Sequence, residues 1–193
     1  RECGVPGTFF YITCALEGKL PPVIGFQIAI NKLGAERLER EILPALLEEY
    51  GLWSYRRLLD RACFDHSEMK MGELPEFRLI KTIFNHFLPP SLQSEFIQKI
   101  FIRHIDEPMK DIVQAWFMSG DELAEMAKAG MELAGHSVKH PWLSMIGQEE
   151  IEQEARVSRS TLNEITNREV TSFAWTFGSS VPRPEAKDAV AKA

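Results

Sequence analysis

The sequence of 193 residues lacks the features that mark several common classes of protein. It has only three cysteines, Cys3, Cys14 and Cys63, which form no Cys-x-x-Cys metal pattern and no disulfide framework. It also lacks an excess of positive charge, because 22 Lys and Arg residues stand against 28 Asp and Glu residues, a formal net charge of −6. This balance argues against a nucleic acid or an anionic membrane as the partner, since both bind basic surfaces.

Long hydrophobic segments are missing as well. No apolar run approaches the ~20 residues of a membrane-spanning helix, and no secretory signal peptide opens the chain. The unpaired cysteines and the lack of a visible leader favour a reducing compartment such as the cytoplasm. The remaining composition, 45% hydrophobic and 26% charged, is that of an ordinary globular protein. The length allows one large domain or a core with an insertion.

The most informative segment that is present runs from His136 to Pro141 and reads His-Ser-Val-Lys-His-Pro. Imidazole is the commonest protein ligand for zinc, and a spacing of four residues is workable for two ligands. Gly135 before the segment and the proline that ends it predict a tight loop at a strand end. Loops in this position hold the catalytic groups of α/β barrels. From the pair alone, a metal site and a surface loop with two solvated histidines remain equal alternatives.

Three segments have the composition of buried strands, and helices are predicted between them. The strand segments are Gly7–Thr13, Met131–Gly135 and Val170–Trp175. Ser119 and Glu122 form a capping box, which predicts the start of a helix just before the second strand.

A further helix is predicted over Gln148–Thr166, directly after Gly147. Its expected inward face consists of small and apolar residues at helical spacing, namely Ile151, Ala155, Ser158 and Leu162. Helices and strands therefore alternate along this part of the chain. That order predicts a parallel α/β arrangement with right-handed crossovers.

The segment from residue 23 to 115 differs from the rest, because it lacks strand alternation and carries apolar residues at helical spacing. Pro44 is expected in the first turn of one of its helices, and Ser91 is expected to be the N-cap of another. We interpret the segment as an inserted helical subdomain. The chain would then consist of barrel segments 1–22 and 116–193 with this insertion between them.

Both ends of the chain read as truncated. The chain begins with what reads as the last residues of a helix, and it finishes inside another helix at Ala193. A strand missing beside Gly7–Thr13 would leave an unpaired edge of the barrel. This edge, or the helical insertion, is expected to allow self-association.

Three motifs in order carry a resemblance to a known family. Residues 4–10 resemble its pattern GVPATFF, residues 136–141 give its His-Ser/Thr-x-x-His-Pro pattern in full, and residues 172–178 resemble SFAYPYG. The chain thus resembles the polysaccharide deacetylases, the carbohydrate esterases of the NodB-homology family. The resemblance covers residues 1–15 and 116–193.

The resemblance implies a distorted (β/α) barrel and a divalent metal, most often zinc, held by His136 and His140. A metal-bound water would attack the acetyl carbonyl of an N-acetylated or O-acetylated carbohydrate. In the family, two aspartates from a motif on the first strand complete the site, and the 193 residues contain no such motif. The chain as given is therefore expected to be inactive, although the family hydrolyses carbon–nitrogen bonds. Asp65, inside the helical segment, reads as a solvated residue and not as a substitute.

The resemblance also assigns roles around the histidines. The backbone N–H of Phe177 corresponds to the donor that completes the oxyanion hole. Trp142 and Trp175 are candidates for lining the sugar site, with packing in the core as the alternative for each. Ser137 is expected to hold the loop by a hydrogen bond. Thr176 stands where the family has proline. This replacement of proline by threonine is expected to loosen the loop.

Two functions are consistent with these motifs. The first is a metal-dependent hydrolase that removes acetyl groups from carbohydrate. The second is a non-catalytic NodB-like domain that binds carbohydrate, or a protein partner, through its helical insertion. A strand ending in two aspartates upstream of Arg1 in the native protein would favour the enzyme.

Overall fold

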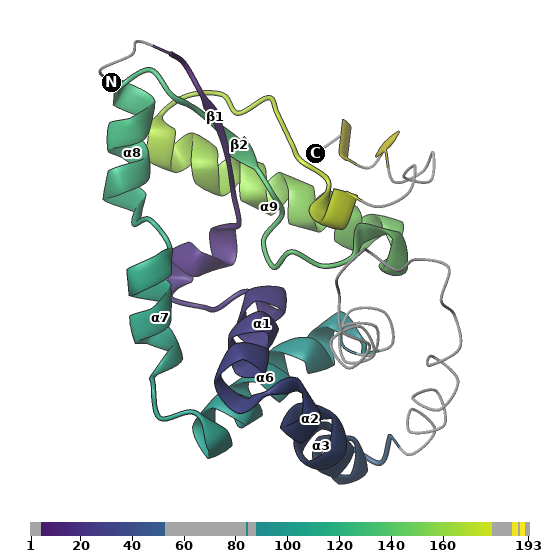
Figure 1. The fold of residues 1–193 in the computed structure, drawn as a ribbon. Helices are drawn as coiled ribbons and strands as arrows, with labels where there is room; N and C mark the ends of the chain where they lie inside the picture. Colours follow the sequence, from purple (N-terminus) through teal and green to yellow (C-terminus); the bar gives the residue numbers. More distant parts are fainter. Residues whose placement is uncertain (1–4, 53–83, 85–87, 179–186, 189, 192–193) are drawn as a thin grey trace. The chain divides into compact units, whose positions relative to one another are not determined.

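The computed structural model describes residues 5–52, 84, 88–178, 187–188 and 190–191. Contacts between them divide the chain into two compact units. The first unit is formed within residues 1–21 and 109–193, and the second within residues 22–108. Figure 1 shows the helices and strands of both units.

The first unit contains a small parallel sheet. Strand β1 (Thr8–Tyr11) pairs with strand β2 (Glu132–Gly135), and the register aligns the two strands residue by residue along their whole length. Figure 1 shows the two strands side by side. The pairing joins segments more than 120 residues apart and brings the carboxyl ends of both strands to the same edge.

The sheet is smaller than the sequence predicted. β1 ends at Tyr11 because the chain turns into the 3-10 helix η1 (Thr13–Glu17). The prediction of a strand over Val170–Trp175 is wrong, since this segment makes only one isolated parallel bridge, between Phe173 and Gly135. The parallel α/β character is present, while a closed barrel stays a prediction because the described residues form two strands.

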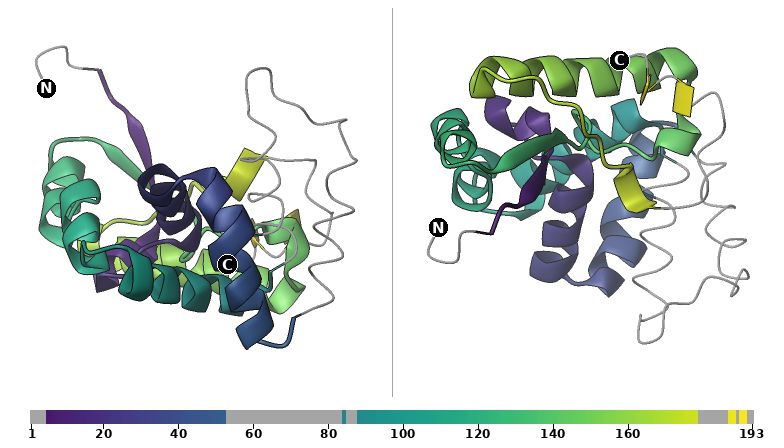
Figure 2. Two further views of the ribbon diagram at one scale, coloured as in Figure 1. Left: turned by 60° about the horizontal axis from the view of Figure 1, so that its bottom comes forward. Right: turned by 90° about the horizontal axis from the view of Figure 1, so that it is seen from above.

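The first unit also contains helices. They are α7 (Met109–Trp116), α8 (Gly120–Lys128) and α9 (Gln148–Thr166), with the 3-10 turns η4 (Leu143–Met145) and η5 (Thr176–Gly178). Both α8 and α9 contact β2 and each other, and Figure 2 shows α9 running beside the strands. The helix–strand–helix order around β2 is the one that the sequence predicted.

Two helix starts follow from local chemistry. The Ser119 hydroxyl accepts a hydrogen bond from the Glu122 amide, and the Glu122 carboxylate accepts one from the Ser119 amide, so the predicted capping box is confirmed. The predicted bounds of α9 are also confirmed. Its predicted inward residues are all buried: Ile151, Ala155, Ser158 and Leu162.

The second unit is helical over its described residues. It contains α1 (Pro22–Leu33), α2 (Ala35–Arg37), the π-helical turn η2 (Leu38–Ile42), α3 (Leu43–Glu49) and α6 (Pro90–His104). α1 packs on α6, and the rings of Phe26 and Phe84 stack with centroids 4.2 Å apart. The described part of this unit contains no strand. Its role as an insertion in a barrel stays a prediction.

Helix starts in the second unit depend on proline. Pro44 lies in the first turn of α3, as predicted. The prediction of Ser91 as an N-cap is wrong, because Pro89 occupies the cap and Pro90 opens α6. Proline suits a first helical position since its φ is fixed and its missing N–H would have no partner there. Asp65 lies outside the described residues.

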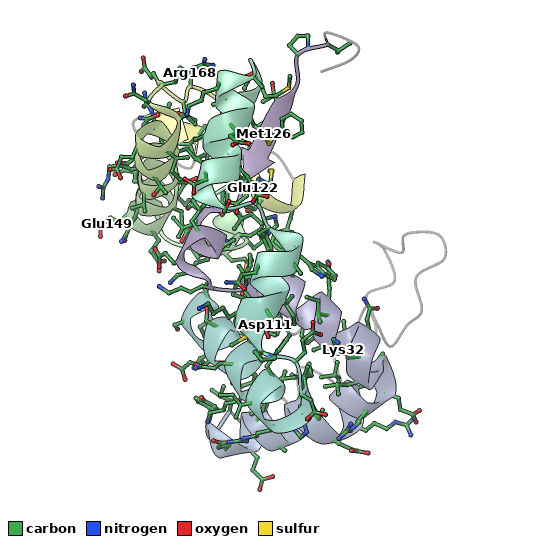
Figure 3. All side chains as sticks on the ribbon, turned by 90° about the vertical axis from the view of Figure 1, so that its left-hand side faces the viewer. Lys32, Asp111, Glu122, Met126, Glu149 and Arg168 are labelled. Carbon is green, nitrogen blue, oxygen red and sulfur yellow. The ribbon has the colours of Figure 1, made fainter. Side chains whose placement is uncertain are left out.

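None of the described helices combines the length and apolar character needed to cross a membrane. Charged side chains lie on the surface of several helices, and Figure 3 labels Lys32 on α1, Asp111 on α7, Glu122 on α8 and Glu149 on α9.

The capping box of α8 yields a stability prediction. Ser119→Ala removes the acceptor for the Glu122 amide and is expected to lower the free energy of unfolding by about 1 kcal/mol. Urea denaturation monitored by circular dichroism measures the change. Ser160→Ala, an exposed site inside α9, is the matched control and should be neutral or slightly stabilising. An equal loss in both variants would contradict the capping role.

Candidate functional site

The two histidines lie in a loop at the carboxyl end of β2, as the glycine and proline around them predicted. The amide of His136 donates to the Tyr11 carbonyl at 3.1 Å and thus continues the β1–β2 ladder by one bond. On the other side, the Gly135 amide donates to the Ser172 carbonyl, and the Ala174 amide donates to the Gly135 carbonyl. The loop therefore starts from a point held by both neighbouring segments.

Gly135 is needed at this point because two other residues approach it closely. A Cβ atom added there would lie 3.0 Å from the Phe173 ring and 3.2 Å from the Ser158 hydroxyl. Ser158 belongs to α9 and is fully buried. The missing side chain lets α9 and the Phe173 segment pack directly against the strand end that carries His136.

The imidazole rings of His136 and His140 face each other. Their Nε2 atoms are 3.0 Å apart, and their planes meet at 75°. His136 Nδ1 lies 3.0 Å from the Ala174 carbonyl oxygen. A carbonyl can only accept, so His136 Nδ1 carries a proton. Nε2 is thus the ring nitrogen of His136 that is directed at His140.

His140 is half-buried and has a different environment. Burial, followed by the neighbouring His136, lowers the pKa of His140 to about 4, so the ring is neutral at neutral pH. Its Nδ1 atom is buried without a hydrogen-bond partner among the described residues. A neutral imidazole is the form that binds metal ions.

The backbone around the pair is strained at three places. Ser137, His140 and Phe177 have φ values of 65°, 59° and 64°, in the left-handed region that non-glycine residues rarely adopt. Each costs about 1–3 kcal/mol and persists only where surrounding contacts enforce it. All three belong to the histidine loop or to the segment beside it, and such clustering is typical of functional sites.

Hydrogen bonds hold the loop in this conformation. The Ser137 hydroxyl is fully buried and accepts from the His140 amide at 2.8 Å, which confirms the predicted structural role of Ser137. The first residues of η1 bind the loop from one side: the Thr13 amide donates to the Ser137 carbonyl and the Cys14 amide to the Val138 carbonyl.

Glu154, on α9, binds the loop from the other side. Its Oε2 atom accepts from the amides of Val138 and Lys139, at 2.8 and 3.0 Å. Sequence reasoning misses this carboxylate. It stands among several glutamates at the start of a helix, and nothing in their spacing distinguishes it from the others.

The stacked rings of Trp142 and Phe177, called the aromatic wall below, lie next to His140. The ring of Phe177 packs edge-on to His140 at 4.7 Å and stacks on Trp142 at 4.4 Å with an interplanar angle of 19°. Phe10, from β1, lies edge-on to His136 at 6.5 Å. The hydroxyl of Thr176 is buried and donates a hydrogen bond to the Pro141 carbonyl, while the loosening expected from the missing proline stays a prediction.

Trp175 has a different setting from Trp142. It is partly buried against the core cluster of Leu143, Ile146 and Ile151. Its ring also meets Phe173 edge-on at 6.2 Å. These contacts are the ones expected if Trp175 packs in the core. A contact of Trp175 with a sugar stays a prediction.

The donor atoms fit part of a zinc site. Two nitrogens 3.0 Å apart can share one ion bonded to each at ~2.0–2.1 Å. The bond from His136 Nδ1 to a backbone carbonyl is also the usual second contact of a zinc-bound histidine. In the part of the chain that the structure describes, no group of three or more His, Cys, Asp and Glu residues gathers. The described residues thus offer two nitrogen donors, where a catalytic zinc site would need three protein ligands.

Residues 101–192 match the family model described as polysaccharide deacetylase. The match confirms the family that the motifs indicated. It includes both histidines, Trp142 and Phe177, while the motif at residues 4–10 lies outside it. The similarity of this segment to the polysaccharide deacetylases points to carbohydrate deacetylation, a hydrolysis of carbon–nitrogen bonds other than peptide bonds. No curated protein and no solved structure matches the chain significantly.

The buried thiol beside the loop gives a prediction about reactivity. Burial, followed by the Glu154 and Glu17 carboxylates, raises the pKa of Cys14 to about 12, against an ordinary 9.0. The folded state thus holds the thiol proton more tightly, and this contribution to stability is lost as the pH rises from about 9 towards 12. At pH 8.5, iodoacetamide should leave Cys14 unmodified in the native chain and react with it in urea.

Peptide mapping by mass spectrometry measures the modification of Cys14, and the unfolded chain is the control for its intrinsic reactivity. Rapid alkylation of Cys14 in the native chain would contradict the burial and the raised pKa.

Proposed function

We propose that His136 and His140 hold a divalent metal, most often zinc in this family, in a deacetylase site that removes acetyl groups from carbohydrate. The observation that carries the proposal is the pair of Nε2 atoms facing each other at 3.0 Å, with the outer nitrogen of His136 bonded to a carbonyl. The solvated-loop alternative predicts rings that turn separately into water. The strain at Ser137 and His140 also favours a functional loop.

The chain's own residues prepare the site in three ways. The Ala174 carbonyl fixes the tautomer and orientation of His136, and burial keeps His140 neutral. The Ser137 hydroxyl accepts a hydrogen bond from the His140 amide and thereby keeps the His140 ring directed at His136. A divalent metal bound there would lower the pKa of a water ligand and polarise the acetyl carbonyl.

Substrate is proposed to lie against the aromatic wall. The stacked rings of Trp142 and Phe177 present an apolar surface next to His140, and sugar rings pack well on aromatic faces. The left-handed backbone at Phe177 aims its peptide group differently from a helical turn. Its backbone N–H is the proposed donor to the oxyanion of the tetrahedral intermediate. Trp175 is a second candidate for contact with the sugar.

The metal site is tested by removing its ligands. The double variant His136→Ala, His140→Ala is expected to lose stoichiometric zinc, because both nitrogen donors are gone. Metal analysis after dialysis against a zinc buffer measures the bound metal. His104→Ala, which removes a partly exposed histidine from α6, is the matched control and should keep the zinc content of the wild type. Unchanged zinc in the double variant would contradict the site.

The 193-residue chain is expected to bind zinc without turnover, because no carboxylate of the described residues completes a group of three with the histidines. Absence of a general base costs ~10²–10⁴ in rate. Acetate release from N-acetylated chito-oligosaccharide measures the activity. Turnover that depends on added zinc would show that a carboxylate outside the described residues, such as Asp65, completes the site. Retention of the oligosaccharide without zinc would instead favour the non-catalytic domain.

A further inference from the structure

We infer that Glu154 is a positioning residue that sets the distance between the two histidine side chains by holding the backbone between them. The inference rests on the proposed metal site and adds a residue that lies outside the segments 4–10, 136–141 and 172–178. Glu154 touches neither imidazole. It acts through the amides of Val138 and Lys139, which are two of the three residues that separate His136 from His140.

The hydrogen bonds of the loop show why this carboxylate matters. η1 satisfies the carbonyls of Ser137 and Val138, and the Ser137 hydroxyl satisfies the His140 amide. The amides of Val138 and Lys139 point the opposite way and find their acceptor in Glu154. The Val138 amide is partly buried and the Lys139 amide is exposed. A partly buried N–H group without an acceptor is costly, so the loop would turn the Val138 amide towards water if Glu154 were absent.

A rearrangement of these two amides would change the distance between the two histidine side chains. Ser137 and His140, on either side of the pair of amides, have left-handed φ values of 65° and 59°. Backbone strain of this kind persists only while the surroundings enforce it. Once the amides are released, rotation at either residue moves the His140 ring away from His136. The separation of 3.0 Å between the Nε2 atoms is therefore coupled to Glu154.

The position of Glu154 on α9 makes it a rigid support. Ile151, Ala155 and Ser158, on the same helix, are buried, and α9 contacts β2 and η1. The carboxylate is thus anchored to the strand whose end carries His136. Sites supported by packed helices are held more accurately than sites supported by loops alone.

Cobalt(II) binding to the full chain tests the inference. Glu154→Ala is expected to weaken cobalt binding by ~10–100-fold, the usual effect of losing a residue behind the metal ligands. Glu154→Gln keeps a side-chain oxygen for the two amides and should stay within about threefold of the wild type, since it loses only charge. Isothermal titration measures the affinity, and the visible cobalt spectrum reports the ligand geometry.

The matched control is Glu149→Ala. Glu149 lies in the first turn of α9 and points away from the unit, as Figure 3 shows. This variant removes the same charge and slightly weakens the same helix through the dipole, so it should bind cobalt like the wild type. Equal affinity in the wild type and Glu154→Ala would overturn the inference. A loss in Glu154→Gln as large as in Glu154→Ala would also overturn it, since the carboxylate would then act by charge or as a ligand.

A metal-free measurement separates this inference from the proposed function. Long-range ¹H–¹⁵N spectra of the imidazoles report the Nδ1–H tautomer of His136 without any metal. The wild type and Glu154→Gln should show this tautomer, and Glu154→Ala should show averaged, solvent-exposed rings. If the wild type binds no cobalt, the metal site fails while these spectra still decide the role of Glu154. Unchanged spectra in Glu154→Ala would then refute it.

Discussion

The described site depends on one constraint, which is that two imidazoles must face each other across a loop with an unfavourable backbone. Ser137 and His140 adopt left-handed conformations, each at a cost of about 1–3 kcal/mol, and only there does the chain turn His140 back to His136. The cost is offset by hydrogen bonds from three directions: η1, α9 and the Ser137 hydroxyl. The site is therefore a product of the packing of the whole first unit and not of the loop alone.

The two parallel strands bring these supports together. Pairing of β1 with β2 places η1, which follows β1, beside the histidine loop, which follows β2. The absence of a side chain at Gly135 lets α9 approach the end of β2, where Ser158 and Phe173 fill the space. The same approach allows the Ala174 carbonyl to reach His136. A short sheet thus suffices to organise the pair, provided that both strand ends meet at one edge.

Local signals in the sequence predicted most of the local features, although the helix start expected at Ser91 lies at Pro90 instead. The capping box at Ser119, the bounds of α9 and the loop before Pro141 each depend on residues within a few positions of one another. Features that depend on distant contacts were missed. Glu154 contacts amides 15 and 16 positions away, and the Phe173 segment forms a single bridge although its composition favours a strand. Composition describes what a segment prefers, while its partners in the fold decide what it forms.

The central claim is that His136 and His140 bind one metal ion together. X-ray absorption at the zinc edge of the zinc-loaded chain tests it most directly, because the fine structure counts imidazole ligands and measures their distances. The account predicts two imidazole nitrogens at ~2.0–2.1 Å. A zinc shell made of oxygen alone, or one with a single imidazole, would contradict the shared site.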